Sequence, residues 1–264
     1  MNFLKIRRGE APLILSIPHA GTTIPVAYEP ILNSLWLARK DADWWMRELY
    51  SFAESFDATI IRTEISRTVI DVNRDPSGVS LYPGQTTTSL CPTETFDGEP
   101  LYHEGKEPDE AEIARRRTEF FAPYHAAITA EITRLRATHK SIVLYDCHSI
   151  RGKMPRLFPG ILPNFNIGTN DGKACDPKIT EKVTAICAAA PNMTHVVNGR
   201  FKGGYITRHH GNPANGVNAI QMELSCRGYM EEPALPTPEN WPTKFNPSAL
   251  ILPTLKTIIE SLLP

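Results

Sequence analysis

The sequence contains no uninterrupted run of about 18 apolar residues, the length that a membrane-spanning helix requires. Its opening segment, MNFLKIRRGE, lacks the apolar core of a secretory signal peptide. An excess of charge of one sign is missing too, because 28 basic residues stand against 29 acidic ones. These absences exclude a protein built on membrane-spanning helices and one that binds nucleic acid through bulk electrostatics. We expect a cytoplasmic protein that interacts with neither membranes nor nucleic acid.

Sequence signatures of several common protein classes are absent as well. The five cysteines are odd in number and widely spaced, and no CxxC pair occurs, which excludes a disulfide framework and a zinc ribbon. The segment GTNDGK at residues 168–173 is one residue short of a phosphate-binding P-loop and is followed by Ala174. Neither GxGxxG nor GxSxG occurs, which argues against a Rossmann dehydrogenase and a serine-dependent α/β-hydrolase.

The composition, by contrast, supports a sizeable hydrophobic core. Of the 264 residues, 41% are hydrophobic and 22% are charged, so we expect a single domain over residues 1–264. Short β-branched apolar runs alternate with longer stretches of helical period, which is the pattern of an α/β fold. We therefore predict a twisted mixed β-sheet flanked by helices. The 23 prolines are spread along the chain and indicate long, stiff loops.

Local patterns predict five strands, four helices and one long loop. The strands cover residues 13–17, 58–63, 68–72, 142–147 and 217–224. The helices cover residues 45–56, 109–138 with an interruption near Pro123, 176–189, and a closing segment that begins at Asn246 and Pro247. Residues 75–108 are rich in Gly and Pro and have no clear period, and we interpret them as a long functional loop.

Three polar residues stand at or near the ends of predicted strands. His19 follows the first strand in SIPHAG, His148 ends the central strand in LYDCHS, and Glu223 lies late in the strand AIQMELS. Open α/β sheets bind ligands at the carboxyl ends of their strands. Two histidines and a carboxylate brought together there would suit a catalytic zinc site with one water. Taken singly, His19 also fits a loop histidine and His148 a hydrogen-bonded core histidine.

A third metal ligand has to come from elsewhere in the chain. Asp43 is the best candidate, because the first turn of a helix can direct a carboxylate toward a neighbouring strand end. Spacing alone favours a plain N-cap for both Asp41 and Asp43, so the two interpretations stay open at this point. Asp146 lies two residues before His148 and therefore on the same face of the strand, where its carboxylate could orient the imidazole.

Cationic residues gather in two segments, SRTVIDVNRDP at residues 66–76 and NGRFKGGYITRHH at residues 198–210. The planar guanidinium fork matches a carboxylate with two hydrogen bonds, so these segments suit an anionic small molecule. We therefore expect an acidic substrate. Structural ion pairs are the alternative for Arg67, Arg74 and Arg208. The histidines expected to be structural are His103, His125, His139 and His195.

Six segments, taken together, resemble the N-formylglutamate amidohydrolase family. They are SIPHAGT, DADWW, SRTVIDVNR, LYDCHSI, NGRFKGGYITRHHG and QMELS, and they follow the family's order at similar separations over nearly the whole chain. The resemblance implies a zinc hydrolase of histidine breakdown that cleaves N-formyl-L-glutamate to formate and L-glutamate. It also implies a fold similar to that of zinc exopeptidases such as the carboxypeptidases.

The likeness to carboxypeptidases assigns roles to individual residues. His19 and His148 match the two zinc histidines. The segment DVNR, with Asn73 and Arg74, matches the pair that holds a substrate carboxylate, and Glu223 in MELS matches the general base.

The sequence departs from these patterns at two places. Carboxypeptidases take their acidic ligand three residues after the first histidine, where this sequence has Thr22, so the resemblance favours Asp43 as the third ligand. Trp45 stands where the family often has His, a difference that bears on substrate preference.

The resulting hypothesis is a zinc-dependent amidohydrolase with an acidic small-molecule substrate. The residues expected to hold Zn2+ are His19, Asp43 and His148. The residues expected to act in catalysis are Glu223 as general base and Arg67 or Arg208 at the oxyanion. The residues expected to bind substrate are Asn73, Arg74, Arg200 and His209. A zinc hydrolase of another N-acyl amino acid or short acidic peptide is the alternative enzyme, and a non-catalytic binder of acidic metabolites is the alternative outside enzymes.

Overall fold

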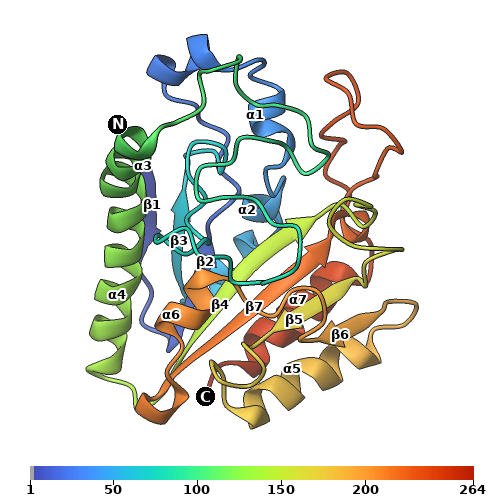
Figure 1. Cartoon of the computed structure of the whole chain (residues 1–264). Helices are drawn as coiled ribbons and strands as arrows, with labels where there is room; N and C mark the ends of the chain where they lie inside the picture. The colour runs from blue at the N-terminus through green and yellow to red at the C-terminus, as the bar shows by residue number, and fades with distance from the viewer. Residues whose placement is uncertain (1–2) are drawn as a thin grey trace.

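A computed structural model describes residues 3–264 and places a seven-stranded mixed sheet at the centre of the molecule (Figure 1). The strands are β1 (Leu4–Arg7), β2 (Leu13–Ile17), β3 (Thr59–Thr63), β4 (Ile142–Ile150), β5 (Phe165–Gly168), β6 (His195–Val197) and β7 (Val217–Ser225). Their order across the sheet is β1-β3-β2-β4-β7-β5-β6. The central strands β3, β2, β4 and β7 are parallel, whereas β1 and β5 pair antiparallel with their inner neighbours.

Helices cover both faces of this sheet, as Figure 1 shows. The α-helices are α1 (Leu37–Lys40), α2 (Met46–Leu49), α3 (Glu110–Arg116), α4 (Ala122–Arg136), α5 (Pro177–Ala189), α6 (Tyr205–His210) and α7 (Ile251–Ser261). The 3-10 helices are η1 (Val26–Ile31), η2 (Ser51–Phe56), η4 (Pro213–Asn215) and η5 (Cys226–Gly228), and η3 (Arg117–Phe121) is a π-helical turn. None of the helices in residues 3–264 is both long and apolar enough to cross a membrane.

Burial on both faces explains why the central strands are continuous apolar runs. All residues of β2, β4 and β7 are buried. Side chains alternate across a strand, so Leu13 and Leu15 pack into the core under α5 and α7, while Ile14 packs into the core under α4. The α/β class and the mixed, helix-flanked sheet predicted from the sequence are confirmed.

Several predicted elements are found with small shifts in their bounds. The predicted helix over residues 109–138 is realised as α3, η3 and α4, and the π-helical turn interrupts it just before Pro123. Asp109 caps α3 and Asp176 caps α5 through their side-chain oxygens. The central strand continues past residue 147 to Ile150, and the closing helix begins at Ile251 instead of residue 246. Residues 75–108 contain no helix or strand, as predicted.

Two predicted elements are wrong. Residues 68–72 form turns, because Val69 N–H donates to Ser66 and the Asp71 carboxylate accepts from Asn73 N–H. The apolar side chains of this segment are buried in the core. Their burial accounts for the strand-like sequence pattern, although the backbone does not form a strand. The helix expected over residues 45–56 is split into α2 and η2, and it is preceded by Trp45 in the left-handed conformation with φ 64°. Strands β1, β5 and β6 and helix α6 were not predicted.

Candidate active site and metal centre

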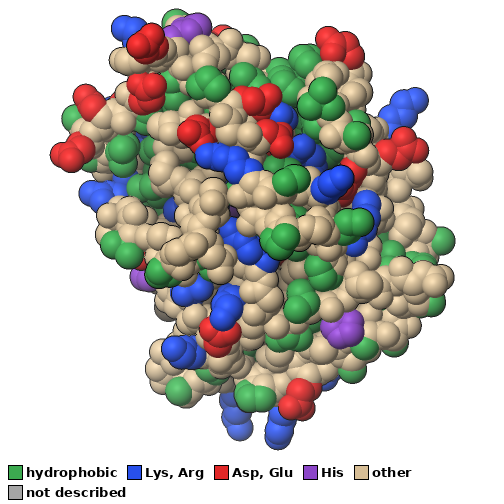
Figure 2. All heavy atoms as spheres, turned by 45° about the vertical axis from the view of Figure 1, so that its right-hand side comes forward, with side chains coloured by type: hydrophobic (Ala, Val, Ile, Leu, Met, Phe, Trp, Pro, Cys, Tyr) green, Lys and Arg blue, Asp and Glu red, His purple; other side chains and the backbone are tan. Residues whose placement is uncertain are grey.

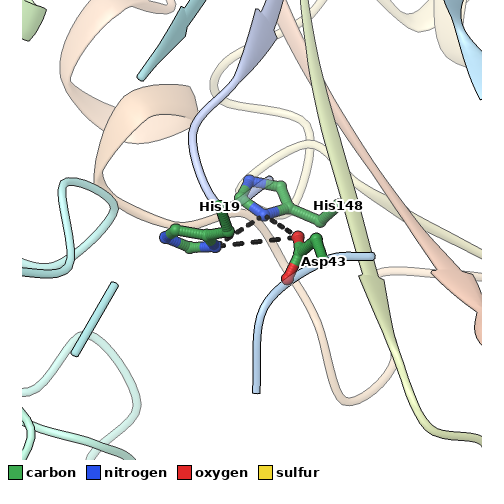
Figure 3. A group of neighbouring side chains, drawn as sticks. All are labelled: His19, Asp43 and His148. Carbon is green, nitrogen blue, oxygen red and sulfur yellow. Dashed lines mark hydrogen bonds and ion pairs between the residues drawn. The ribbon is translucent and has the colours of Figure 1, made fainter. Parts of the chain in front are cut away.

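Three buried side chains from separate segments converge beside the carboxyl ends of β2 and β4 (Figure 3). His19 follows β2, Asp43 lies between α1 and α2, and His148 lies in β4. The Nδ1 atoms of the two histidines are 3.2 Å apart. Asp43 Oδ2 is 3.7 Å from Nδ1 of His19 and 3.4 Å from Nδ1 of His148. The three atoms therefore face a common point.

The far nitrogen of each imidazole contacts a carboxylate. His19 Nε2 is 2.8 Å from Asp71 Oδ1, and His148 Nε2 is 2.9 Å from Asp146 Oδ2. When Nε2–H donates to these oxygens, the Nδ1 lone pairs point at the shared centre. A carboxylate behind each histidine is the usual support of a metal-binding imidazole. Two imidazole nitrogens and a carboxylate oxygen thus form a donor set that could hold a divalent metal ion.

The electrostatics of the group also suit a cation. Burial lowers the pKa of His19, and Arg67 lowers it further, which favours the neutral imidazole that a metal requires. Burial acts on His148 in the same direction, but the charges of Asp146 and Asp43 outweigh it and raise its pKa well above the usual range. The carboxylates around His148 therefore stabilise positive charge at this centre, whether as a proton or as a metal ion.

Neither aspartate at the predicted helix start is a cap. Asp43 Oδ2 accepts a hydrogen bond from the backbone N–H of Ser149, and its Oδ1 lies 3.4 Å from Nη1 of Arg67. Asp41 accepts from the backbone N–H of Phe96, and burial raises its pKa to about 6. The capping interpretation is wrong because both carboxylates turn into the protein interior.

Glu223 comes to the same site from β7. It is the register partner of His148 on the neighbouring strand β4, and only 7% of its surface is exposed. Gln221 Nε2 lies 3.3 Å from its Oε2. Burial raises the pKa of Glu223 to about 8. His19, His148 and Glu223 all line one cavity, so the predicted base faces the same cavity as the two histidines.

Three arginines line this cavity, and they differ in whether a carboxylate lies close enough to form an ion pair with them. Arg67 Nη2 lies 2.6 Å from Asp71 Oδ2, and Arg74 Nη1 lies 3.5 Å from the same oxygen. Arg200 has no carboxylate within ion-pair distance among residues 3–264, although burial lowers its pKa. It donates instead to the backbone carbonyls of Leu157 and Thr86. In the view of Figure 2, basic side chains gather in the middle of the molecular face.

Two predicted residues lie outside the cavity lining. Arg208 Nε donates to the carbonyl of Gly203, and His209 is exposed and stacks on Tyr205 with ring centroids 4.7 Å apart. Helix α6 buries Ile206, Thr207 and His210, and none of its residues lines the cavity. The oxyanion role predicted for Arg208 and the substrate contact predicted for His209 stay predictions.

Asn73 lines the cavity, but its side-chain amide already contacts other residues of the protein. Its Oδ1 accepts from Ile206 N–H, and its Nδ2 lies 2.9 Å from His148 Nε2. The same Nδ2 donates to Asp146 Oδ2 at 3.4 Å, so Asn73 connects α6 to the carboxylate that contacts His148. Its predicted contact with a substrate carboxylate stays a prediction.

Sequence reasoning missed several residues that build the site. Asp71 contacts His19, Arg67 and Arg74, and Tyr82 comes into the cavity wall from the long loop. Asp71 had a signal in the sequence, because it stands two residues before Asn73 just as Asp146 stands two residues before His148. Tyr82 had none, since its loop lacks any periodic pattern.

Comparisons with known proteins agree with this site. The model of the N-formylglutamate amidohydrolase family matches residues 11–230. An N-formylglutamate deformylase of Pseudomonas aeruginosa is 45% identical over 231 residues, covering 88% of this chain and 86% of that protein. An N-formylglutamate deformylase of Pseudomonas putida is 43% identical over 229 residues, covering 87% and 85%.

Two solved structures share the fold. The crystal structure of N-formylglutamate amidohydrolase from Ralstonia eutropha superposes with a TM-score of 0.77 at 20% identity, covering 98% of this chain and 95% of that one. A protein of Agrobacterium tumefaciens superposes with a TM-score of 0.66 at 20% identity, covering 86% of both chains. The family match and the two curated relatives together show that this chain belongs to the N-formylglutamate amidohydrolase family.

Proposed function

We propose that this protein hydrolyses N-formyl-L-glutamate to formate and L-glutamate with a bound zinc ion. Family membership makes it a hydrolase of an amide bond, and two relatives carry the name N-formylglutamate deformylase. The observation that carries the proposal is one cavity that holds two metal-binding histidines, the buried Glu223 and three arginines. Such a cavity places residues that could carry out hydrolysis next to cations that could bind the carboxylates of an acidic substrate.

The metal-binding part is supported by its donor set. His19 and His148 would each give Nδ1 and Asp43 would give Oδ2, while the Nε2 atoms are already bonded to Asp71 and Asp146. Three protein ligands leave one position open, as catalytic zinc sites do. When bound, zinc lowers the pKa of a water molecule and polarises a carbonyl oxygen.

The proton transfers fall to Glu223. Its carboxylate would accept a proton from the attacking water and deliver it to the nitrogen of the leaving glutamate. Burial raises the pKa of Glu223 to about 8 in the metal-free protein, and the positive charge of a bound metal ion would favour the ionised carboxylate that the first transfer requires. Arg67 lines the cavity beside Asp43 and would stabilise the negative charge that develops on the formyl oxygen.

The remaining arginines would bind the two carboxylates of the substrate. The α-carboxylate lies close to the scissile amide, and Arg74 is linked to the metal-binding group because Asp71 contacts both Arg74 and His19. The side-chain carboxylate lies farther along the substrate. Arg200 is held by loop carbonyls and has no carboxylate partner among the described residues, so it is the natural partner for that distant charge.

The test is formate release from a panel of N-formyl, N-acetyl and N-succinyl amino acids by protein supplied with zinc. N-formyl-L-glutamate should be the preferred member. Equal rates with N-formyl-L-glutamine would indicate a general N-formyl amino acid hydrolase, and preference for another acyl group would indicate a different N-acyl substrate. Binding of acidic amino acids without any turnover would instead indicate a non-catalytic binding protein.

A further inference from the structure

Tyr82 contacts two arginines, only one of which faces the cavity. The Tyr82 ring centroid is 5.4 Å from the guanidinium carbon of Arg200 and 5.2 Å from that of Arg208. Both distances allow a cation–π interaction. Tyr82 and Arg200 line the cavity and Arg208 does not. The tyrosine therefore connects a cavity arginine to a second arginine in the surrounding structure.

The hydroxyl group of Tyr82 is fixed to the segment that precedes α6. It donates a hydrogen bond to the carbonyl of Gly203 at 2.9 Å and lies 3.3 Å from the backbone N–H of Lys202. Arg208 Nε donates to the same Gly203 carbonyl at 2.8 Å. The ring of Tyr82 is thus held at its hydroxyl end by backbone groups and at its face by arginine contacts, which leaves it little freedom to turn.

Arg200 depends on such neighbours because it lacks a counter-ion. Its Nε and Nη2 donate to the carbonyls of Leu157 and Thr86, and no carboxylate in the described part of the chain forms an ion pair with it, although the charge of Glu223 acts on it from farther away. A partly buried cation without a counter-ion is unfavourable until an anion reaches it. Uncharged carbonyls and aromatic rings can hold the guanidinium in place while leaving its charge available to a ligand.

We propose that Tyr82 is a positioning residue that holds Arg200 for the side-chain carboxylate of the substrate, with Arg208 supporting the tyrosine from outside the cavity. The inference rests on the proposed function and adds a determinant of its specificity. It also gives Arg208 a place in the site that differs from the oxyanion role predicted from the sequence. A ligand without that carboxylate gains nothing from the arrangement.

The experiment compares Tyr82→Leu and Tyr82→Phe with the wild type on N-formyl-L-glutamate and N-formyl-L-glutamine. Loss of the ring in Tyr82→Leu should raise KM for N-formyl-L-glutamate about tenfold with kcat nearly unchanged, the size expected for cation–π contacts. KM for N-formyl-L-glutamine should stay within about twofold, because that substrate does not use the guanidinium charge. Tyr82→Phe keeps the ring and should restore most of the preference.

The chain offers a matched control in Tyr28. This tyrosine also lies over two arginines, with its ring centroid 5.5 Å from Arg115 and 4.2 Å from Arg116, but it does not line the cavity. Tyr28→Leu and Tyr28→Phe should leave the ratio of the two substrates unchanged. A Tyr82→Leu variant that loses both substrates equally, or that behaves like Tyr28→Leu, would overturn the inference.

A binding measurement separates this inference from the proposed function. Calorimetric titration of wild-type protein and Tyr82→Leu with L-glutamate and L-glutamine needs no turnover. Selective weakening of L-glutamate binding in the variant supports the role of Tyr82 even if the wild type releases no formate, in which case only the proposed function fails. Equal L-glutamate affinities in the two proteins overturn the role of Tyr82 even if N-formyl-L-glutamate is hydrolysed.

Discussion

His148 and Glu223 are register partners on the neighbouring parallel strands β4 and β7. Register partners in a sheet direct their side chains to the same face. Both residues accordingly line the same cavity, so the position of the Glu223 carboxylate relative to the His148 imidazole is set by backbone pairing in the most buried part of the fold. A rigid pair of strands can hold these groups more accurately than loops can.

The first prediction concerns the role of Glu223 in proton transfer. Glu223→Gln should retain zinc and fold while kcat falls by at least about 100-fold, the usual loss on removal of a general base. Formate release and metal content of the purified variant check this. A variant with a near-normal rate would place the base elsewhere.

The same substitution should change the pH dependence of stability in metal-free protein. Burial raises the pKa of Glu223 to about 8, so the folded state keeps a proton that the unfolded chain releases in the ordinary glutamate range. Stability should therefore decline as the pH rises from about 5 to about 8, and Glu223→Gln should lessen that decline. Tm values of wild-type and variant protein across this range, after treatment with a chelator, provide the measurement.

The metal prediction rests on the donor set at His19, Asp43 and His148. Carefully purified protein should carry about one zinc ion per chain, and His148→Ala should lose it. A chelator should abolish formate release and added zinc should restore it. Absence of divalent metal by elemental analysis, together with no activation by zinc, would contradict the proposed mechanism.

The sequence was informative where the local pattern has one physical cause. Strands β2, β4 and β7 are buried on both faces, which requires continuous apolar runs, and their polar residues His148 and Glu223 stand out against that background. The carboxyl ends of parallel strands then bring such residues together. These features made the central parallel strands, and the approach of His19, His148 and Glu223 to one cavity, accessible to prediction.

The sequence was ambiguous where two structures share one pattern. An aspartate before an amphipathic stretch fits both a helix cap and a buried ligand, and only the tertiary structure shows that Asp43 faces the two histidines. Likewise, the short helix α6 buries Ile206, Thr207 and His210 and leaves His209 exposed, and six residues carry too little periodicity to predict which side is buried. Tyr82 reaches the site through loop geometry alone.

A chain of hydrogen bonds behind His148 leads to the next prediction. Asp146 Oδ1 accepts from Ser16 Oγ at 2.9 Å, and Ser16 Oγ lies 2.9 Å from the hydroxyl of Tyr124 on α4. Ser16→Ala and Tyr124→Phe should loosen Asp146 and weaken zinc binding, by about 10- to 100-fold for the nearer residue. Competition with a chromophoric chelator measures the affinity.

A matched control for this prediction lies on the other side of β4. Tyr50 and Tyr145 form a buried hydroxyl pair 3.3 Å apart that does not reach the metal-binding residues. Tyr50→Phe should leave zinc affinity unchanged. If Ser16→Ala and Tyr50→Phe bind zinc with the same affinity as the wild type, the hydrogen-bonded chain has no part in metal binding.

The two arginines assigned to carboxylates should differ in their effects on substrate choice. Arg200→Met should reduce kcat/KM for N-formyl-L-glutamate by about 100-fold or more, because a charged hydrogen-bonded pair is lost, and should affect N-formyl-L-glutamine far less. Arg74→Met should reduce kcat/KM for both substrates, since both have the α-carboxylate, while zinc content is retained. If Arg200→Met reduced kcat/KM equally for both substrates, the two arginines would not have the separate roles proposed for them.

The last prediction concerns two buried histidines outside the cavity lining. His125 Nδ1 lies 3.0 Å from His210 Nε2, and His125 Nε2 lies 2.8 Å from the carbonyl of Val72, so the pair is held in the neutral form between α4 and α6. Burial lowers the pKa of His125 to about 4 and that of His210 to about 3.

Between about pH 6.5 and pH 4 the unfolded chain therefore binds protons that the folded protein does not, and stability must fall as the pH falls. His210→Gln should lessen this loss by on the order of 2 kcal/mol between about pH 7 and pH 4, as measured by urea unfolding. The exposed His103, which does not contact this pair, provides the control, since His103→Gln should leave the acid sensitivity unchanged. Equal acid sensitivity of wild type and His210→Gln would show that other groups govern unfolding in acid.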